Sequence, residues 1–200
     1  MMKDFNMLID PLPKSYEGYL INWQFYNGIL ISDCLSSDDF PDDENGKAQK
    51  IYMASTLLFG NGVPPFEVAF EGLKWFLSCG SVLNEGDRQE GSEKYFSFDD
   101  DKQRLFSAFM VKYGINLNKA DDLHWFEFIA LMNDLYKTSF RNVVDLRMMK
   151  PKDMKNYSSL QKAEILKQKR KFAIKKSLEQ TYTSDQIQAI DNFDKLISSN

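Results

Sequence analysis

Histidine and cysteine are scarce in this 200-residue sequence, which contains one His and two Cys. A zinc site needs three or four ligands, and neither a cysteine nor a second histidine lies near His124 in the sequence. A catalytic Ser-His-Asp or Cys-His arrangement would depend wholly on His124. Cys34 and Cys79 have no CxxC spacing, so we interpret them as small buried residues of a reduced protein. These shortages argue against an enzyme, and we expect no catalytic residue, metal or cofactor.

Long apolar runs are also lacking. Acidic residues interrupt the opening "MMKDFNMLIDP", which therefore does not read as a signal peptide. The longest uncharged stretches fall short of the ~18 residues that a membrane span requires. Disorder of the whole chain is excluded, because 43% hydrophobic and 14% aromatic residues supply enough apolar surface for a core. We therefore expect a folded protein of the cytoplasm that does not enter a membrane.

Three short motifs resemble binding loops or metal sites. "GNGVPP" lacks the third glycine of a dinucleotide fingerprint and the lysine of a phosphate-binding loop. "PDDENG" begins like a calcium loop, but Pro41 and Tyr52 stand where ligands are required. Asp99, Asp100 and Asp101 could hold magnesium or could stabilise the first turn of a helix through its dipole. We favour the helix dipole.

Charge is distributed unevenly around a net value of −4. No Lys or Arg occurs between Lys14 and Lys47, where seven acidic residues fall. Residues 147–176 carry eleven basic residues and two acidic ones. A molecule with such a charge dipole could associate head to tail with itself, or offer its basic part to an acidic partner.

Apolar periodicity predicts a mostly helical chain. The stretch "YEGYLIN" is typical of a small hairpin or of an extended segment that leads into the first helix. Asn22 is predicted to cap the first helix, and residues 36–46 and 81–94 are expected to be surface loops. Helices are expected over residues 22–34, 47–59, 64–79 and 99–113, the last two ending at Gly80 and Gly114.

The stretch "LHWFEFIALMNDL", residues 123–135, is apolar around most of its circumference. This pattern is typical of a helix buried by its neighbours, so we expect a central core helix over residues 123–136, capped at Asn118 and Asp121. His124 and Glu127 lie one turn apart on its polar stripe. They could form a general-base pair or half of a metal site, but we favour a rim pair that covers the core aromatics.

A basic helix is expected over residues 158–181, and a small last helix beginning at Thr183. The apolar residues of the basic helix do not collect on one face, so it is predicted to be solvated, mobile or completed by a partner. Lys169, Arg170 and Lys171 are the candidate partner-binding residues. Nucleic acid is not favoured as that partner, because only Phe172 interrupts the charges and the protein is acidic overall.

These expectations combine into an all-α fold: a compact bundle of five or six helices, with a small N-terminal hairpin and a peripheral basic C-terminal helix. Residues 1–150 are expected to form the helical core domain. Residues 151–200 are expected to form the basic helix and a C-terminal helical tail.

Several stretches together resemble the bacteriophage gp-fifteen family. They are "LIDPLPKSYEGYLINWQF", "LKWFLSCG", "YFSFDDDKQRLFSAFMVKYGINL", "LHWFEFIALMNDL" and "VVDLRMMKPKDM". The likeness runs from Met7 to Lys171 in the same order, and residues 177–200 have no counterpart. No single motif is chemically diagnostic, and the resemblance assigns no catalytic residues.

The resemblance implies a role in phage tail assembly, because genes of this family typically lie between the tail-tube gene and the tape-measure gene. Proteins encoded there are tail assembly chaperones, which keep the tape-measure protein soluble while tube subunits polymerise around it. The implied partners are the tape-measure protein, the tail-tube protein and further copies of the chain, in the cytoplasm of the host cell. The alternatives are a structural or morphogenetic protein of the virion tail and a nucleic-acid-binding phage regulator.

Overall fold

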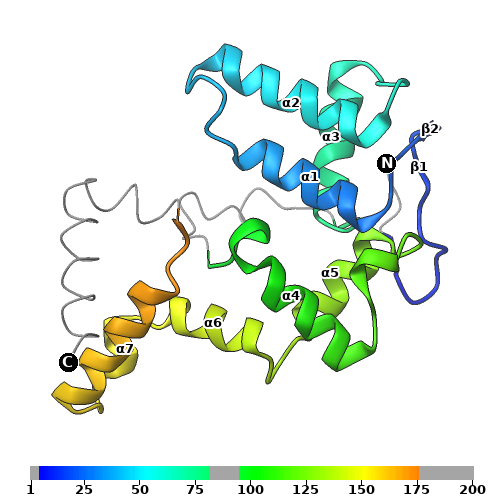
Figure 1. The fold of residues 1–200 in the computed structure, drawn as a ribbon. Coiled ribbons are helices and arrows are strands. Elements are labelled where there is room, and N and C mark those ends of the chain that lie inside the picture. Colours follow the sequence, from blue (N-terminus) through cyan, green and yellow to red (C-terminus); the bar gives the residue numbers. More distant parts are fainter. Residues whose placement is uncertain (1–4, 82–94, 176–200) are drawn as a thin grey trace. The chain divides into compact units, whose positions relative to one another are not determined.

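A computed structural model describes residues 5–81 and 95–175, and this part of the chain is mostly helical (Figure 1). It contains seven α-helices and one two-stranded antiparallel hairpin. The predicted all-α fold with an N-terminal hairpin is therefore confirmed, with slightly more helices than the five or six expected. The predicted helix from Thr183 and nearly all of the predicted loop over residues 81–94 lie outside the described residues.

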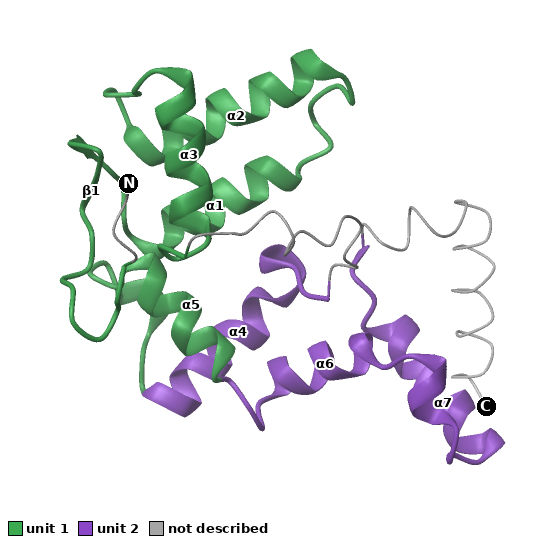
Figure 2. Ribbon diagram, turned by 180° about the vertical axis from the view of Figure 1, so that it is seen from behind, with its two compact units in different colours: residues 1–92, 114–134 green, residues 93–113, 135–200 purple. Residues whose placement is uncertain are grey.

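The chain divides into two compact units, and each of them is built from two separate segments of the sequence (Figure 2). Unit 1 comprises residues 1–92 and 114–134, and unit 2 comprises residues 93–113 and 135–200. The predicted boundary after residue 150 stays a prediction, since much of the expected second domain lies outside the described part of the chain.

Unit 1 opens with a hairpin of β1 (Ser15–Tyr16) and β2 (Tyr19–Leu20), in which Tyr16 pairs with Tyr19. The two turn residues, Glu17 and Gly18, have φ values of 48° and 84°. Two consecutive residues with positive φ form the tight turn whose twist matches that of paired strands, and Gly18 adopts this conformation without steric cost. The glycine in "YEGYLIN" therefore forms the turn of the hairpin.

Four α-helices and one short 3-10 helix complete unit 1. They are α1 (Phe25–Ser36), α2 (Glu44–Phe59), α3 (Phe66–Leu77), η2 (Leu117–Lys119) and α5 (Trp125–Asn133). α1 packs against α2, α3 and α5. At Gly28 a Cβ atom would lie 2.1 Å from the Trp125 ring, so the close approach of α1 and α5 requires glycine there.

The predicted start of the first helix is wrong. Asn22 does not cap α1, since Gln24 occupies the N-cap position. The backbone N–H of Asn22 instead donates to the Leu58 carbonyl at 2.7 Å, and its side-chain amide donates to the Leu57 carbonyl at 2.8 Å. Asn22 thus satisfies carbonyls near the end of α2, because an amide that could serve a local cap can equally serve a helix brought close by the fold.

The second helix begins three residues earlier than predicted. Asp43 caps α2 by accepting a hydrogen bond from the Gly46 N–H at 2.7 Å, so Glu44, Asn45 and Gly46 belong to the helix rather than to the acidic loop. A Cβ atom on Gly46 would lie 1.8 Å from the Pro41 carbonyl oxygen. Gly46, which was predicted to lie in a surface loop, therefore lets the acidic segment pack closely against the first turn of α2.

Unit 2 contains α4 (Phe98–Tyr113), α6 (Ser139–Met148), the 3-10 helix η3 (Pro151–Met154) and α7 (Ser159–Lys171). α6 packs against both α4 and α7. Gly114 follows α4 with a φ of 67°, as its predicted place at the helix end requires. The unit 2 core consists of Leu105, Ala108, Phe109, Leu135, Phe140, Val143, Val144, Met154 and Ile174.

Over residues 5–81 and 95–175, none of the helices combines the length and the hydrophobicity needed to cross a lipid bilayer.

Candidate functional site

The candidate partner-binding residues lie at the end of α7. This helix begins with a capping box: the Ser158 hydroxyl accepts from the Gln161 N–H at 3.2 Å, and the Gln161 side chain accepts from the Ser158 N–H at 2.8 Å. None of the thirteen residues of α7 is buried. The helix therefore depends on its caps and on contacts along one edge, as the sequence predicted for a peripheral helix.

The three basic residues of the last turn of α7 do not share one environment. The Lys169 Nζ donates to the Met149 carbonyl at 2.6 Å, and this side chain is half-buried. Arg170 and Lys171 are exposed. Lys169 thus holds α7 to the end of α6, whereas Arg170 and Lys171 present positive charge to solvent. All three also lie where the helix dipole favours cations.

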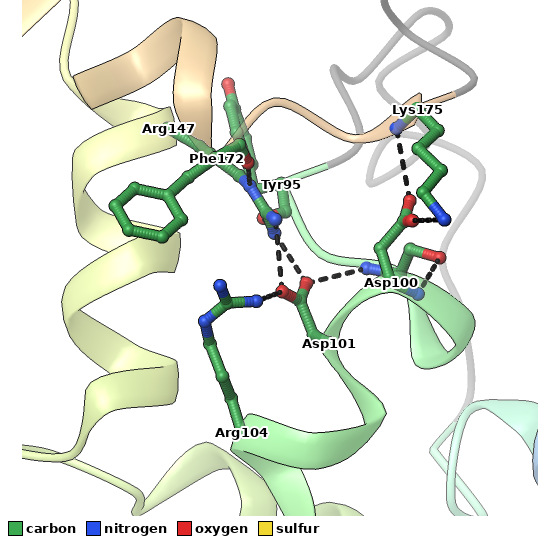
Figure 3. Close-up of polar contacts among 8 residues, drawn as sticks. Tyr95, Asp100, Asp101, Arg104, Arg147, Phe172 and Lys175 are labelled. Carbon is green, nitrogen blue, oxygen red and sulfur yellow. Dashed lines mark hydrogen bonds and ion pairs between the residues drawn. The ribbon is translucent and has the colours of Figure 1, made fainter. Parts of the chain in front are cut away.

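A buried ion pair between α4 and α6 organises the surroundings of α7 (Figure 3). The Arg147 guanidinium donates to both carboxylate oxygens of Asp101, at 2.5 and 3.0 Å. The side chains are 8% and 2% exposed, so this is a bidentate pair removed from water. Arg104, one turn along α4, adds a third hydrogen bond to Asp101 at 3.2 Å.

Arg147 also binds the two chain segments that flank this pair. Its Nε donates to the Phe172 carbonyl at 2.6 Å, and its Nη1 donates to the Tyr95 carbonyl at 3.1 Å. Figure 3 shows the guanidinium between these carbonyls and Asp101. One side chain therefore ties together the entry to α4, the exit from α7 and α6 itself, with its charge compensated and several donors satisfied.

The exit from α7 is fixed by further contacts with α4. The Arg104 guanidinium lies 5.0 Å from the centroid of the Phe172 ring. Ile174 is buried, and the Lys175 backbone N–H donates to the Asp100 carboxylate at 3.1 Å. These contacts, together with the Arg147 bond, determine where the basic end of α7 lies within unit 2.

The three consecutive aspartates of α4 have different partners. Asp99 pairs with Lys102 at 2.7 Å on the surface, and this hydrogen bond lowers the pKa of Asp99. Asp100 accepts from the Lys175 backbone, and Asp101 forms the buried pair. All three lie in the first turn, where the dipole favours them, but the dipole does not explain the burial of Asp101. In the parts of the chain that the structure describes, no three His, Cys, Asp or Glu side chains are grouped to hold a metal ion.

His124 caps the helix that the sequence placed around it. Its Nδ1 accepts from the Phe126 N–H at 3.0 Å, and its Nε2 lies 2.8 Å from the Pro13 carbonyl oxygen. A neutral ring with its proton on Nε2 satisfies both partners. The Glu127 carboxylate accepts from the His124 N–H at 3.1 Å, which completes a capping box. The prediction that Asn118 and Asp121 cap this helix is therefore wrong.

Burial favours the neutral form of the His124 ring. The side chain is 1% exposed, it stacks on Trp23 with an interplanar angle of 8°, and burial lowers its pKa below the usual value. His124 and Glu127 do form a pair, but His124 lies inside unit 1 rather than at a rim. The His124 ring holds the start of α5 against Pro13 of the N-terminal segment, and Glu127 completes the cap of the helix.

The Asp101–Arg147 pair escaped the sequence analysis because no local pattern connects residues 46 positions apart. Asp101 fits a helix N-terminus without any partner, and Arg147 fits a run of basic residues. The only available signal was an arginine in the otherwise amphipathic stretch "VVDLRMM", where a buried cation implies a buried carboxylate.

Residues 8–174 match the family model described as Bacteriophage Gp15 protein. This match covers most of the chain, which therefore belongs to the bacteriophage Gp15 family, as the order of its motifs predicted. No curated protein and no solved structure matches the chain.

Proposed function

We propose that this protein is a phage tail assembly chaperone. In this role it binds the tape-measure protein in the host cytoplasm, assists assembly of the tail tube around it, and catalyses no reaction. The observation that carries the proposal is membership of the phage family over residues 8–174. The motif resemblance adds the expected gene position, between the tail-tube and tape-measure genes.

The surface of α1 supports binding of a long amphipathic helix. Tyr26 and Leu30 lie one turn apart on α1, and they are 42% and 50% exposed. Amphipathic helices bind by placing apolar side chains, spaced one turn apart, against such surfaces. We infer that this face of unit 1 contacts the tape-measure protein, whose hydrophobic residues need cover until the tube encloses them.

Co-expression with the neighbouring tape-measure protein tests the proposal directly. We expect the tape-measure protein to be insoluble alone, to become soluble with this chain, and to co-elute with it in size-exclusion chromatography. The double variant Tyr26→Ser with Leu30→Ser should lose co-elution. Val111→Ser removes an 82% exposed apolar residue from unit 2 and serves as the matched control. A tape-measure protein that stays insoluble with the wild-type chain contradicts the proposal.

A structural or morphogenetic protein of the virion tail is the alternative within the same family. The two roles differ in the fate of the protein, because a chaperone leaves the tail before maturation and a structural component stays. Mass spectrometry of purified particles therefore separates them. Peptides of this protein at tail-component stoichiometry would support the virion role, and their absence would support the chaperone.

A nucleic-acid-binding regulator is favoured by one observation, the exposure of Arg170 and Lys171 at the end of α7. Binding to nucleic acid would weaken steeply as salt rises, since phosphate contacts release counterions. Charge reversal at Lys169, Arg170 and Lys171 would abolish it. Electrophoretic mobility shift with the wild-type chain at low and high salt distinguishes this role from protein binding.

A further inference from the structure

A shallow apolar depression lies on the surface of unit 1. It has a volume of about 400 Å³ and is lined by Phe40, Ala48, Gln49, Tyr52 and Met53. The last four residues recur at helical spacing and form one face of α2. Tyr52 is 66% exposed and Met53 is 48% exposed. Exposed apolar side chains gathered around a hollow offer an apolar surface to a partner.

Acidic residues flank Phe40 in the sequence, and we call this segment, residues 38–44, the acidic rim of the depression. Phe40 belongs to the segment before α2, where residues 38–44 include five acidic side chains and no basic one. The nearest cations in sequence are Lys47 and Lys50 on α2, and the Lys50 Nζ lies 5.9 Å from the Phe40 ring centroid. The segment that contributes Phe40 to the apolar hollow therefore carries excess negative charge. A complementary partner is a helix with exposed apolar side chains and excess positive charge.

The outer face of α7 in unit 2 has this composition. Leu160 is 82% exposed and Leu166 is 45% exposed, and with Ala163 they recur every three residues along one side of the helix. Lys167 and Arg170 are exposed beside them. The opposite side of α7 is half-buried in unit 2, so this stripe faces away from the unit.

The dimensions of the two surfaces also agree. α7 has 13 residues and α2 has 16, which correspond to lengths of about 20 and 24 Å. Two helices of this length can pack along most of their extent. Leu160 and Leu166 would enter the hollow beside Tyr52 and Met53, while Lys167 and Arg170 would approach the acidic rim.

We propose that the outer face of α7 in one copy binds the α2 depression of a second copy. One chain carries both halves of this contact, so a second copy supplies the apolar-basic helix that the acidic rim requires. The contact is heterologous, because each bound pair leaves one α7 face and one depression unused. Such contacts add further copies and form a closed ring or an open filament.

Sedimentation velocity of the full chain alone provides the first test. We expect assemblies larger than a monomer at about 0.1 M salt, and association about tenfold weaker or more at about 1 M salt, where charges are screened within about 3 Å. A chain that stays monomeric at every concentration and both salt levels overturns the proposal. No tape-measure protein is needed, so the result is independent of the proposed chaperone function.

Variants of the two faces identify the contact. The depression variant is Tyr52→Glu with Met53→Glu, and the helix variant is Leu160→Glu with Arg170→Glu. Each should be monomeric and should keep the far-UV circular dichroism of the wild type, since all four side chains are exposed. Leu20→Glu is the control for unit 1, because it adds a charge at a 78% exposed hairpin residue, and it should associate normally.

The control for the helix variant is Lys152→Glu with Lys155→Glu, two exposed residues that precede α7. This control changes the charge of unit 2 by more than the helix variant does, but leaves the α7 stripe intact. We expect it to associate as the wild type does. Loss of association in this control to the same extent as in the helix variant would show that only net charge matters, and would overturn the specific contact.

Mixing the two face variants is the decisive experiment. The depression variant keeps a normal α7, and the helix variant keeps a normal depression, so the mixture should form dimers and nothing larger. A mixture that stays monomeric overturns the proposal, as does association that survives in either variant alone. If the wild type is monomeric and the depression variant instead fails to bind tape-measure protein, the depression belongs to that partner and the proposal is wrong.

Discussion

Asp101 and Arg147 lie on different helices and 46 residues apart, yet their side chains meet through two hydrogen bonds in the interior of unit 2. Two backbone carbonyls, of Tyr95 and Phe172, accept the other hydrogen bonds that Arg147 donates. The pair therefore connects the core of the unit to the segment that leaves the basic helix. The position of α7 within unit 2 therefore depends on an ion pair between two other helices, α4 and α6.

Replacement of Arg147 with Met should destabilise the protein strongly, because Asp101 would then be buried without its main partner. We expect the free energy of unfolding in urea to fall by about 3–5 kcal/mol. The matched control is Arg141→Met on the same helix, which breaks an exposed pair with Asp145 and should cost about 0–1 kcal/mol. Equal losses in the two variants would show that the buried pair contributes no more than a surface pair.

The His124 cap should make stability depend on pH. Burial lowers the pKa of His124 in the folded chain, so below about pH 6.5 the unfolded chain takes up the proton more readily. The stabilisation is therefore present above the unfolded pKa and lost as the pH falls, with a slope of up to about 1.4 kcal/mol per pH unit.

The variant His124→Asn measures this contribution, because Asn can also cap a helix but does not titrate. Thermal unfolding of both proteins should be followed between pH 7.5 and pH 5.5, each about one unit from the ordinary histidine pKa. We expect the wild type to lose more stability than the variant as the pH falls. Parallel curves would show that His124 titrates alike in the folded and unfolded chains.

Gly28 should not tolerate a side chain, since its place for a Cβ atom is occupied by the Trp125 ring. Gly28→Ala should lower the free energy of unfolding by about 1–3 kcal/mol, although alanine is the better helix former. Gly62→Ala is the control, because the nearest atom there, the Phe59 carbonyl oxygen, lies at 3.8 Å. Chemical denaturation compares the free energies of unfolding of the two variants. A stabilised Gly28→Ala protein would contradict the close packing of α1 and α5.

The thiol of Cys79 should react slowly in the folded protein. Burial raises the pKa of Cys79 to about 11, so the reactive thiolate is about a hundredfold scarcer near neutral pH than in an unfolded chain. Alkylation by iodoacetamide in the Cys34→Ser variant should therefore be slow, speed up as the pH rises towards that value, and increase sharply in urea. Equal rates in the folded and unfolded states would contradict the raised pKa of the half-buried Cys79 thiol.

Local sequence rules located helix ends where the signal was a backbone constraint. Gly114 ends α4 with the positive φ that favours glycine. α3 lies two residues inside each end of the predicted range 64–79, because Pro65 is its N-cap rather than part of its first turn and the helix ends at Leu77, before Gly80. The same rules failed where the signal was a polar side chain. Asn22 and Asn118 could cap a helix in isolation, but polar side chains have several possible partners, and the fold decides which of them is near.

The candidate site was predictable only in outline. The sequence predicted a basic, helical and peripheral segment, because these properties depend on composition and periodicity. It did not predict that Lys169 binds the Met149 carbonyl whereas Arg170 and Lys171 are exposed. Three consecutive residues point in different directions from a helix, and only the packing of α7 shows which direction meets protein.

The sequence by itself determined the helical character, the N-terminal hairpin and the phage family, because helices and tight turns arise from interactions among residues a few positions apart. Tertiary structure decided the rest. It brought Asp101 to Arg147, placed His124 inside unit 1, and divided the segment around α5 and Leu135 between two units. These outcomes depend on the path of the chain through space, since the strength of an ion pair or a buried cap is set by distance and burial, which no local pattern encodes.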